Sequence, residues 1–221
     1  MNAIESCVEP VDSEVQDIET HQRALGNCRR CAQMTGPVVM GRPVHSTILS
    51  LGQAPGDREG PAGRPFAWTA GKTLFNWFSG IGVDEELYRS RVYMAAVCRC
   101  FPGKNPQGGD RVPTRQEISN CRYWLEQEFR LLQPRLIIPI GKLAIAQLLP
   151  VNKLSDVIGQ AHSLELGQRQ VDVIPLPHPS GLSTWFKTEP GKTLLAHAMA
   201  LIAGHPAWRE TMSVEAWFLA I

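Results

Sequence analysis

Four cysteines in this sequence have the spacing of metal ligands. Cys28 and Cys31 form the run CRRC, whose two-residue spacing lets both sulfurs reach one metal. Cys100 follows a predicted strand, and Cys121 lies on the next predicted helix. Four thiolates suit either a zinc ion or an iron–sulfur cluster. The alternative, scattered reduced thiols, stays open at this point, because CRRC alone does not decide between the two.

Two further cysteines complicate this assignment. Cys98 stands two residues before Cys100, so the run CRC offers two candidates for one ligand position. If Cys98 ends the preceding strand, its side chain can point into the core instead. Cys7 lies in a segment without clear structure, and we expect it to be a free thiol.

A second unusual stretch is GQAPGDREGPAGRPF, Gly52–Phe66. It contains too many glycines and prolines for a helix or a strand, so it predicts a long loop between a buried strand and a helix. The triplet GKT, which begins at Gly71 and at Gly191, is not part of a phosphate-binding loop. That motif needs a glycine five residues earlier, where this chain has Phe66 and Phe186. Both triplets are interpreted as helix starts.

Alternating strands and helices must position these residues. Hydrophobic patterning predicts strands over 46–52, 91–97 and 135–141, and a hairpin or late strand over 162–180. Helices are predicted over 13–28, 71–82, 114–133, 142–149 and 191–204. Ser13 is the expected N-cap of the first, and Thr114 with Glu117 forms a capping box on the third.

This alternation predicts an α/β fold with a parallel sheet covered by helices on both faces. Ligands of such sheets sit beyond the carboxyl ends of the strands, where the loops 52–66, 98–113 and 175–185 are expected. The 221 residues suffice for one domain, which we place at 13–221 after a flexible N-terminus at 1–12.

Charge and hydropathy limit the possible partners and compartment. The net charge is +1, so an acidic partner must meet a local basic patch. The N-terminal residues contain no long apolar run, and we therefore expect no signal peptide and no membrane segment. The expected localisation is cytoplasmic and reducing, where the six cysteines would not form a disulfide framework.

Taken together, these motifs resemble the uracil-DNA glycosylase superfamily, and most closely its iron–sulfur branch, family 4. The resemblance runs from about Cys28 to Ala203. The motifs that carry it are CRRC, GQAPGDREGPAGRPF, RCFPGKNPQGGDRVPTRQEISNC and HPSGLS. It implies a three-layer α/β/α fold with a central, mainly parallel four-stranded sheet. It also implies a structural [4Fe-4S] cluster on Cys28, Cys31, Cys100 and Cys121, with family position favouring Cys100 over Cys98.

The resemblance gives these loops a use in excising uracil from single- or double-stranded DNA, with free uracil as a product. Such an enzyme flips the nucleotide out, stacks the base, stabilises the leaving anion and places a water. His178 would stabilise the anion, and Phe66 would stack on the base. The implied base pocket consists of Gly52, Gln53, Ala54, Pro55, Gly56, Phe66 and Ala96.

The segment HPSGLS also resembles the HPSPLS loop of family 1, in which a serine contacts phosphate and a leucine enters the base stack. This implies a DNA-binding role for Ser180, Gly181 and Leu182, with Leu182 as the wedge. Additional phosphate contacts are expected from Arg58, Lys187, Lys104 and Arg111.

Several residues depart from the family patterns. Family 4 has glutamate where this chain has Gln53, and family 1 has aspartate where it has Ala54. Asp57 is therefore our candidate for orienting the water, with the Gln53 amide as a weaker alternative. The superfamily usually has an asparagine at the end of the second strand, where this chain has Ala95 and Ala96. We expect Gln53 to read the base in its place.

The resulting hypothesis is a monomeric, monofunctional glycosylase, because no lysine is placed to form a Schiff base. An alternative is a catalytically weak member of the same superfamily that binds damaged or single-stranded DNA. A third possibility is a zinc-stabilised nucleotide-binding protein unrelated to repair, which would require the loop matches to be coincidental.

Overall fold

The computed structural model describes residues 17–181 and 183–213. Its centre is a five-stranded sheet with strand order β2-β1-β3-β5-β4. The strands are β1 (Ile48–Gly52), β2 (Tyr93–Ala96), β3 (Leu136–Pro139), β4 (His162–Leu166) and β5 (Arg169–Val173). Strands β2, β1, β3 and β5 pair in parallel, and β4 pairs antiparallel to β5. The fifth strand is the first arm of the predicted hairpin, so the sheet is one strand wider than expected.

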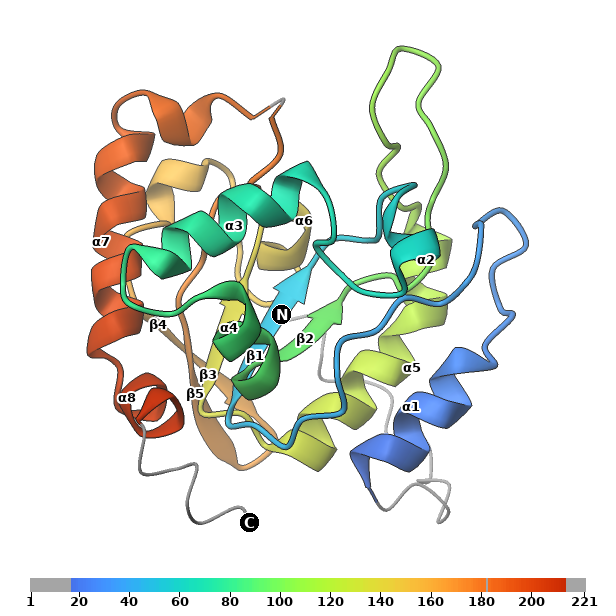
Figure 1. The fold of residues 1–221 in the computed structure, drawn as a ribbon, viewed down its shortest axis with the longest axis horizontal. Helices are drawn as coiled ribbons and strands as arrows, with labels where there is room; N and C mark the ends of the chain where they lie inside the picture. The colour runs from blue at the N-terminus through green and yellow to red at the C-terminus, as the bar shows by residue number, and fades with distance from the viewer. Residues whose placement is uncertain (1–16, 182, 214–221) are drawn as a thin grey trace.

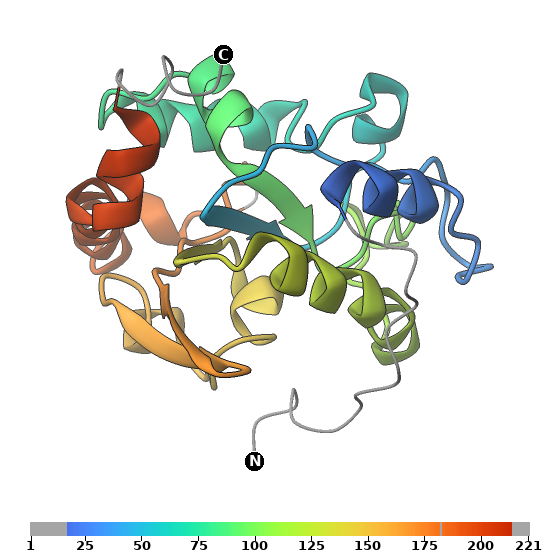
Figure 2. The same ribbon diagram turned by 90° about the horizontal axis from the view of Figure 1, so that it is seen from below.

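Helices cover both faces of this sheet, which gives the predicted three layers (Figures 1 and 2). Helices α1 (Ile18–Gly26) and α5 (Arg115–Leu132) pack on one face. The opposite face carries α3 (Thr69–Ser79), α4 (Glu85–Arg91), α7 (Gly191–Gly204) and α8 (Pro206–Met212). Two short helices, α2 (Glu59–Ala62) and α6 (Lys142–Ile145), lie in connections after β1 and β3.

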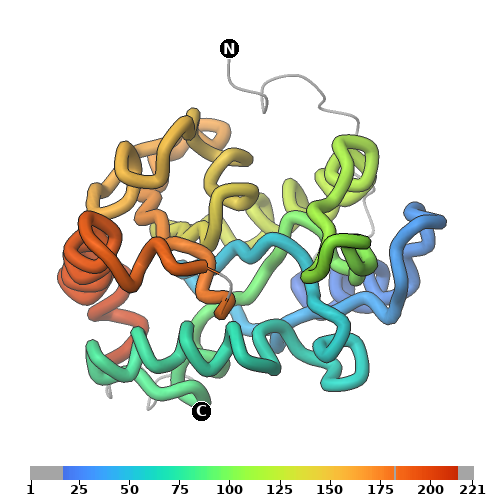
Figure 3. The backbone as a smooth tube through the Cα atoms, turned by 90° about the horizontal axis from the view of Figure 1, so that it is seen from above, coloured from blue at the N-terminus to red at the C-terminus, as the bar shows by residue number. Residues whose placement is uncertain are grey.

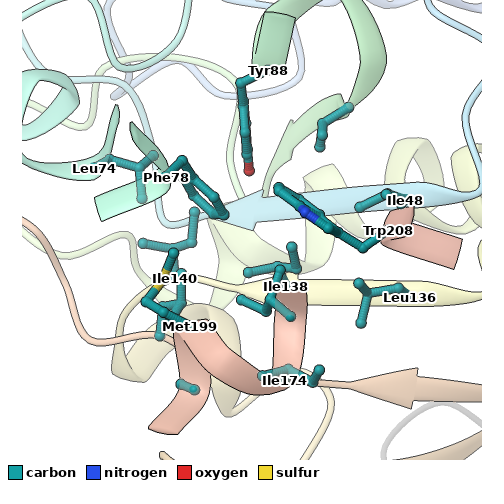
Figure 4. Close-up of a cluster of buried hydrophobic side chains, with 14 of the residues drawn as sticks. Ile48, Leu74, Phe78, Tyr88, Leu136, Ile138, Ile140, Ile174, Met199 and Trp208 are labelled. Atoms are coloured by element: carbon teal, nitrogen blue, oxygen red, sulfur yellow. The ribbon is translucent and has the colours of Figure 1, made fainter. Parts of the chain in front are cut away.

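Alternation along the strands divides the core into two clusters. In β1, Ile48 points to the face covered by α3 and α7, whereas Leu49 points to the face covered by α5. On the first face the aromatic rings of Phe78 and Trp208 stack with their centroids 5.4 Å apart, beside Tyr88 (Figure 4). Because successive strand residues face opposite ways, each short strand contributes to both clusters.

The helix boundaries largely follow the capping signals in the sequence. The predicted capping box is confirmed: Glu117 N donates to the Thr114 hydroxyl, and Thr114 N donates to the Glu117 carboxylate. Helix α1 begins at Ile18, and its N-cap is Asp17 in place of the expected Ser13, because the Asp17 carboxylate accepts a hydrogen bond from Thr20 N. Ser13, Cys7 and the predicted flexible segment 1–12 lie outside the described residues.

The prediction that Gly52–Phe66 holds no helix is wrong, because α2 forms one turn inside it. Pro61 lies in the first turn, where a missing N–H is tolerated, and the turn ends at Gly63 in the left-handed conformation (φ 64°). Helix α4 was not predicted from the sequence. Within the described part of the chain, no helix is long and apolar enough to cross a membrane.

Candidate active site

A pocket of about 430 Å³ lies at the carboxyl ends of β1 and β2. Three connections contribute to its wall, and we name them the first loop (residues 53–68, after β1), the second loop (97–114, after β2) and the third loop (174–190, after β5). Figure 3 shows these segments at the same end of the molecule. The parallel strands place them there, because their carboxyl ends share one edge of the sheet.

All seven residues of the sequence-derived base pocket line this cavity. They are Gly52, Gln53, Ala54, Pro55, Gly56, Phe66 and Ala96. Gly52 has a packing reason to be glycine, since an added Cβ would lie 3.3 Å from the Phe66 ring. The main chain of β1 can therefore approach the aromatic ring more closely than a side chain would permit.

The backbone of Phe66 is strained. Its φ of 53° lies in the left-handed region, which costs a residue other than glycine roughly 1–3 kcal/mol. Arg89 of α4 holds this conformation through hydrogen bonds from its guanidinium to the carbonyl oxygens of Pro65 (2.9 Å) and Phe66 (3.1 Å). Gly71 packs against the same carbonyl, and an added Cβ would lie 1.8 Å from it. Neighbouring elements therefore fix the place of the Phe66 ring.

Two carboxylates in the first loop have different environments. Glu59 accepts a hydrogen bond from Gly56 N at 3.2 Å. Burial raises the pKa of Glu59, and hydrogen bonds from the backbone amides of Gly56, Phe66 and Ala67 oppose this rise. Asp57 is half exposed, and a hydrogen bond from Lys104 lowers its pKa. Asp57 therefore stays ionised at the pocket, while Glu59 supports the loop from within.

His178 lines the pocket from the third loop. Its Nδ1 accepts a hydrogen bond from Ser180 N at 3.2 Å, so the neutral ring carries its proton on Nε2. Burial lowers the pKa of His178, and the charge of Asp110 opposes this shift. Gly141 lies behind the ring with φ 89°, and an added Cβ would be 2.9 Å from Cδ2. The site thus presents a neutral imidazole with a hydrogen to donate.

Sequence reasoning missed Asp110, which the second loop brings to the pocket. This loop forms a long hairpin above the sheet, coloured green in Figure 1, with a bridge between Lys104 and Asp110. Lys104 Nζ lies 2.8 Å from Asp110 Oδ1 and 2.9 Å from Asp57 Oδ2. A carboxylate in a loop at a strand end was the available sequence signal, but nothing local indicated that it would face His178.

The predicted DNA-contacting residues divide into two groups. Arg58 and Ser180 line the pocket, as does Lys104. Arg111 pairs with Glu117, and Lys187 lies at the end of a short 3-10 turn, with its ammonium 5.7 Å from the Phe186 ring. Neither of these two cations lines the cavity, nor does Gly181. Leu182 lies outside the described residues.

The thiols of three separate segments gather near the base of the second loop. Cys121 on α5 accepts hydrogen bonds from the thiols of Cys98 and Cys31, which lowers its pKa. Burial, followed by the charges of Cys121, Cys28 and Cys31, raises the pKa of Cys100 to about 11. Cys98 is buried within the core cluster and still reaches Cys121.

These thiols lie near one another without forming a ready metal site in the described residues. Across residues 17–181 and 183–213, no three His, Cys, Asp or Glu side chains could hold a metal ion as they stand. The donor set is nevertheless all sulfur, which matches zinc and iron–sulfur chemistry. The five candidate sulfurs come from the segments 28–31 and 98–100 and from helix α5.

Comparison with known proteins agrees with this architecture. Residues 39–203 match the model of the uracil DNA glycosylase superfamily. A type-4 uracil-DNA glycosylase of Pyrobaculum aerophilum is 29% identical over 174 residues, covering 75% of this chain and 84% of that protein. The type-4 enzyme of Thermotoga maritima is 30% identical over 169 residues, covering 75% and 82%. A type-5 uracil-DNA glycosylase of P. aerophilum is 29% identical over 150 residues, covering 54% and 64%. This chain belongs to the uracil DNA glycosylase superfamily.

Proposed function

We propose that this chain is a monofunctional uracil-DNA glycosylase of DNA repair, which flips uracil out of DNA and leaves an abasic site. The observation that carries the proposal is His178, a neutral imidazole with its proton on Nε2, in a pocket that the first loop also lines. Membership of the superfamily and similarity to proteins named type-4 uracil-DNA glycosylase support it.

In the proposed reaction, the bond between C1′ of the sugar and N1 of uracil breaks, and its electron pair leaves with the base. The ring of Phe66 stacks on the flipped uracil. His178 donates a hydrogen bond from Nε2 to O2 of the uracil anion, where negative charge develops. A water adds to C1′ and gives its proton to the Asp57 carboxylate, which the Lys104 contact keeps ionised at neutral pH. Asp57 then releases this proton to solvent and the uracil anion takes one up, so the products are free uracil and abasic DNA.

Gln53 is the proposed reader of the base. It lines the pocket, and its amide offers one donor and one acceptor group to a pyrimidine edge. The end of β2 carries Ala95 and Ala96, which have no polar side-chain atom for this purpose. We therefore assign discrimination of uracil to Gln53 together with the main chain of residues 52–56.

The DNA strand would lie across the mouth of this pocket. The proposed contacts are Ser180 and Gly181 of the third loop, with Leu182 as the wedge, and the cations Arg58 and Lys187. Phosphate contacts of this kind position DNA without reading its sequence. The substrate class is uracil-containing DNA, single- or double-stranded.

A structural [4Fe-4S] cluster on Cys28, Cys31, Cys100 and Cys121 forms part of the proposal. The gathering of these thiols from three segments supports it, because a shared cluster would join those segments. The cluster supplies no step of the reaction. The protein is further proposed to be a cytoplasmic monomer with a single domain at 13–221.

The test is a cleavage assay on uracil-containing oligonucleotides, single-stranded and duplex. We expect wild-type protein to leave abasic sites, and His178→Ala to lower the single-turnover rate by roughly tenfold to a thousandfold, as for removal of one oxyanion donor. DNA binding by the variant should be unchanged. Wild-type protein that binds these strands without cleaving them would support the binding-only alternative, which the absence of a polar side chain at Ala95 and Ala96 favours.

A further inference from the structure

The indole of Trp68 is unusually open to solvent. Trp68 is the N-cap residue of α3, its side chain is 56% exposed, and it lines the pocket. In the described part of the chain, the other large hydrophobic residues that are exposed to solvent are Val112 and Leu201. Trp208, in contrast, is 3% exposed within the core. Trp68 therefore contributes little to the core and presents aromatic surface beside the site.

Arg58 accompanies this ring. Its guanidinium carbon lies 5.6 Å from the centroid of the Trp68 ring, within the range of a cation–π contact. Arg58 stands immediately before α2 within the first loop, and Trp68 is the last residue of that loop. The contact therefore joins two parts of the same loop. Such a contact favours one orientation of the indole. The result is a planar aromatic surface with a positive charge beside it.

We propose that Trp68 and Arg58 form a stacking site for an unpaired nucleobase next to the flipped nucleotide. The inference rests on the proposed function, because the nucleotide held in the pocket is what places its neighbour at Trp68. A base stacks on an aromatic side chain regardless of which base it is, because every base has a planar aromatic face. Arg58 alone could serve a phosphate, but a phosphate would have no use for the exposed indole.

The site favours an unpaired neighbour for a physical reason. In a duplex, both faces of the neighbouring base are covered by adjacent base pairs, and one must be exposed at the expense of stacking energy. In a single strand the face is already free. The structure therefore assigns Trp68 to the recognition of single-stranded or locally opened DNA, as a binding residue that takes no part in bond cleavage.

The experiment measures the Kd of protein variants for modified DNA strands and compares the variants and the strands in a double-mutant cycle. Three single-stranded oligonucleotides carry one non-hydrolysable uracil nucleotide: one is complete, one lacks the base on the 5′ side, and one lacks the base on the 3′ side. For the complete strand, Trp68→Ala should raise Kd by roughly fivefold to a hundredfold, which corresponds to 1–3 kcal/mol. For the strand without the stacked base, the same variant should change Kd by less than twofold. Trp68→Phe should keep most of the wild-type affinity.

Val112→Ala is the matched control, because Val112 is 59% exposed but does not line the pocket. It should bind all three strands as the wild type does. If Trp68→Ala weakens binding of all three strands equally, or of none, the stacking site is wrong. Cleavage of uracil by the wild type, measured separately, decides the proposed function. Cleavage without coupling in the cycle refutes only the stacking site, and coupling without cleavage refutes only the glycosylase activity.

Discussion

The first and second loops border the same pocket but are held in different ways. The first loop is fixed through its backbone: Glu59 binds its amides, and Arg89 binds the carbonyls of Pro65 and Phe66. The second loop has main-chain hydrogen bonds near its base, and in addition its own side chains fix it near its two ends. Arg99 pairs with the buried Glu128 on α5 and donates to Ala96 O at 2.8 Å, and Arg111 pairs with Glu117.

This difference shows how the two loops can serve one reaction in separate ways. A loop held by its main chain keeps a shape, and the first loop offers close-packed backbone and an aromatic ring. A loop held at its base can extend a hairpin, and the second loop brings the charges of Lys104 and Asp110 to the pocket. We therefore expect substitutions at the base of the second loop to affect the pocket from a distance. Substitutions in the first loop should affect only the part of the pocket next to them.

The largest expected effect is at the base of the second loop. If Cys100 is a cluster ligand, Cys100→Ser should remove the brown colour of the purified protein. It should also lower the free energy of unfolding by roughly 2–5 kcal/mol, the range for losing a native cross-link. Visible absorption and denaturant unfolding measure the two effects. Cys98→Ser is the matched control and should keep both properties, although it also removes a hydrogen bond to Cys121. A colourless wild-type protein with stoichiometric zinc would contradict the iron assignment.

An intermediate effect is expected from the charge at the tip of the second loop. The Asp110 carboxylate favours the imidazolium form of His178, so Asp110→Asn should lower the pKa of that ring further below its ordinary value of 6.5. Because the proposed donor is neutral His178, activity should fall as the pH drops through its pKa. The variant should therefore move this acid limb to lower pH.

The pH dependence of the single-turnover rate measures this shift. Asp57→Asn is the control, since Asp110 is the charge that opposes the lowered pKa of His178. Asp57→Asn should lower the rate without moving the acid limb. A limb that moves to higher pH in Asp110→Asn would mean that the carboxylate does not act on a neutral His178.

The smallest expected effect is a difference in stability between two variants, and it tests the strain in the first loop. Phe66→Ala and Phe66→Gly both remove the ring, but only glycine adopts a φ of 53° without a penalty. The glycine variant should be more stable than the alanine variant by roughly 1 kcal/mol. Denaturant unfolding of the two variants measures the difference, and both should lose uracil excision. Equal stabilities would show that the loop relaxes when the ring is absent.

Local patterns in the sequence were sufficient to predict most of the framework. The apolar runs predicted β1, β2 and β3, and Thr114 with Glu117 predicted the start of α5, because strand burial and helix capping depend on nearby residues. The hairpin at residues 162–180 was anticipated without its pairing, since only contact with β3 places β5 inside the sheet. The residues around the pocket were predicted from motif resemblance.

Three features of the site could not be predicted from local patterns. Arg89 is buried beneath Phe66 from a helix that the sequence did not indicate. The charge of Asp110 acts on His178 only because two loops fold over the same edge of the sheet, and Trp68 was given no role from the sequence. Each depends on contacts between residues far apart in the chain or on exposure to solvent, which neither periodicity nor composition encodes.

Lys104 joins the two loops across the pocket through its ion pairs with Asp57 and Asp110. All three side chains are solvent-accessible, and attraction between such charges is screened over about 10 Å at 0.1 M salt and about 3 Å at 1 M. The contact between the two loops therefore depends on the ionic strength of the solution, whereas the sheet beneath them keeps its geometry. If the proposed function holds, a polyanion that neutralises Lys104 would act on the same ion pairs as added salt, and the approach of DNA would weaken the contact between the two loops.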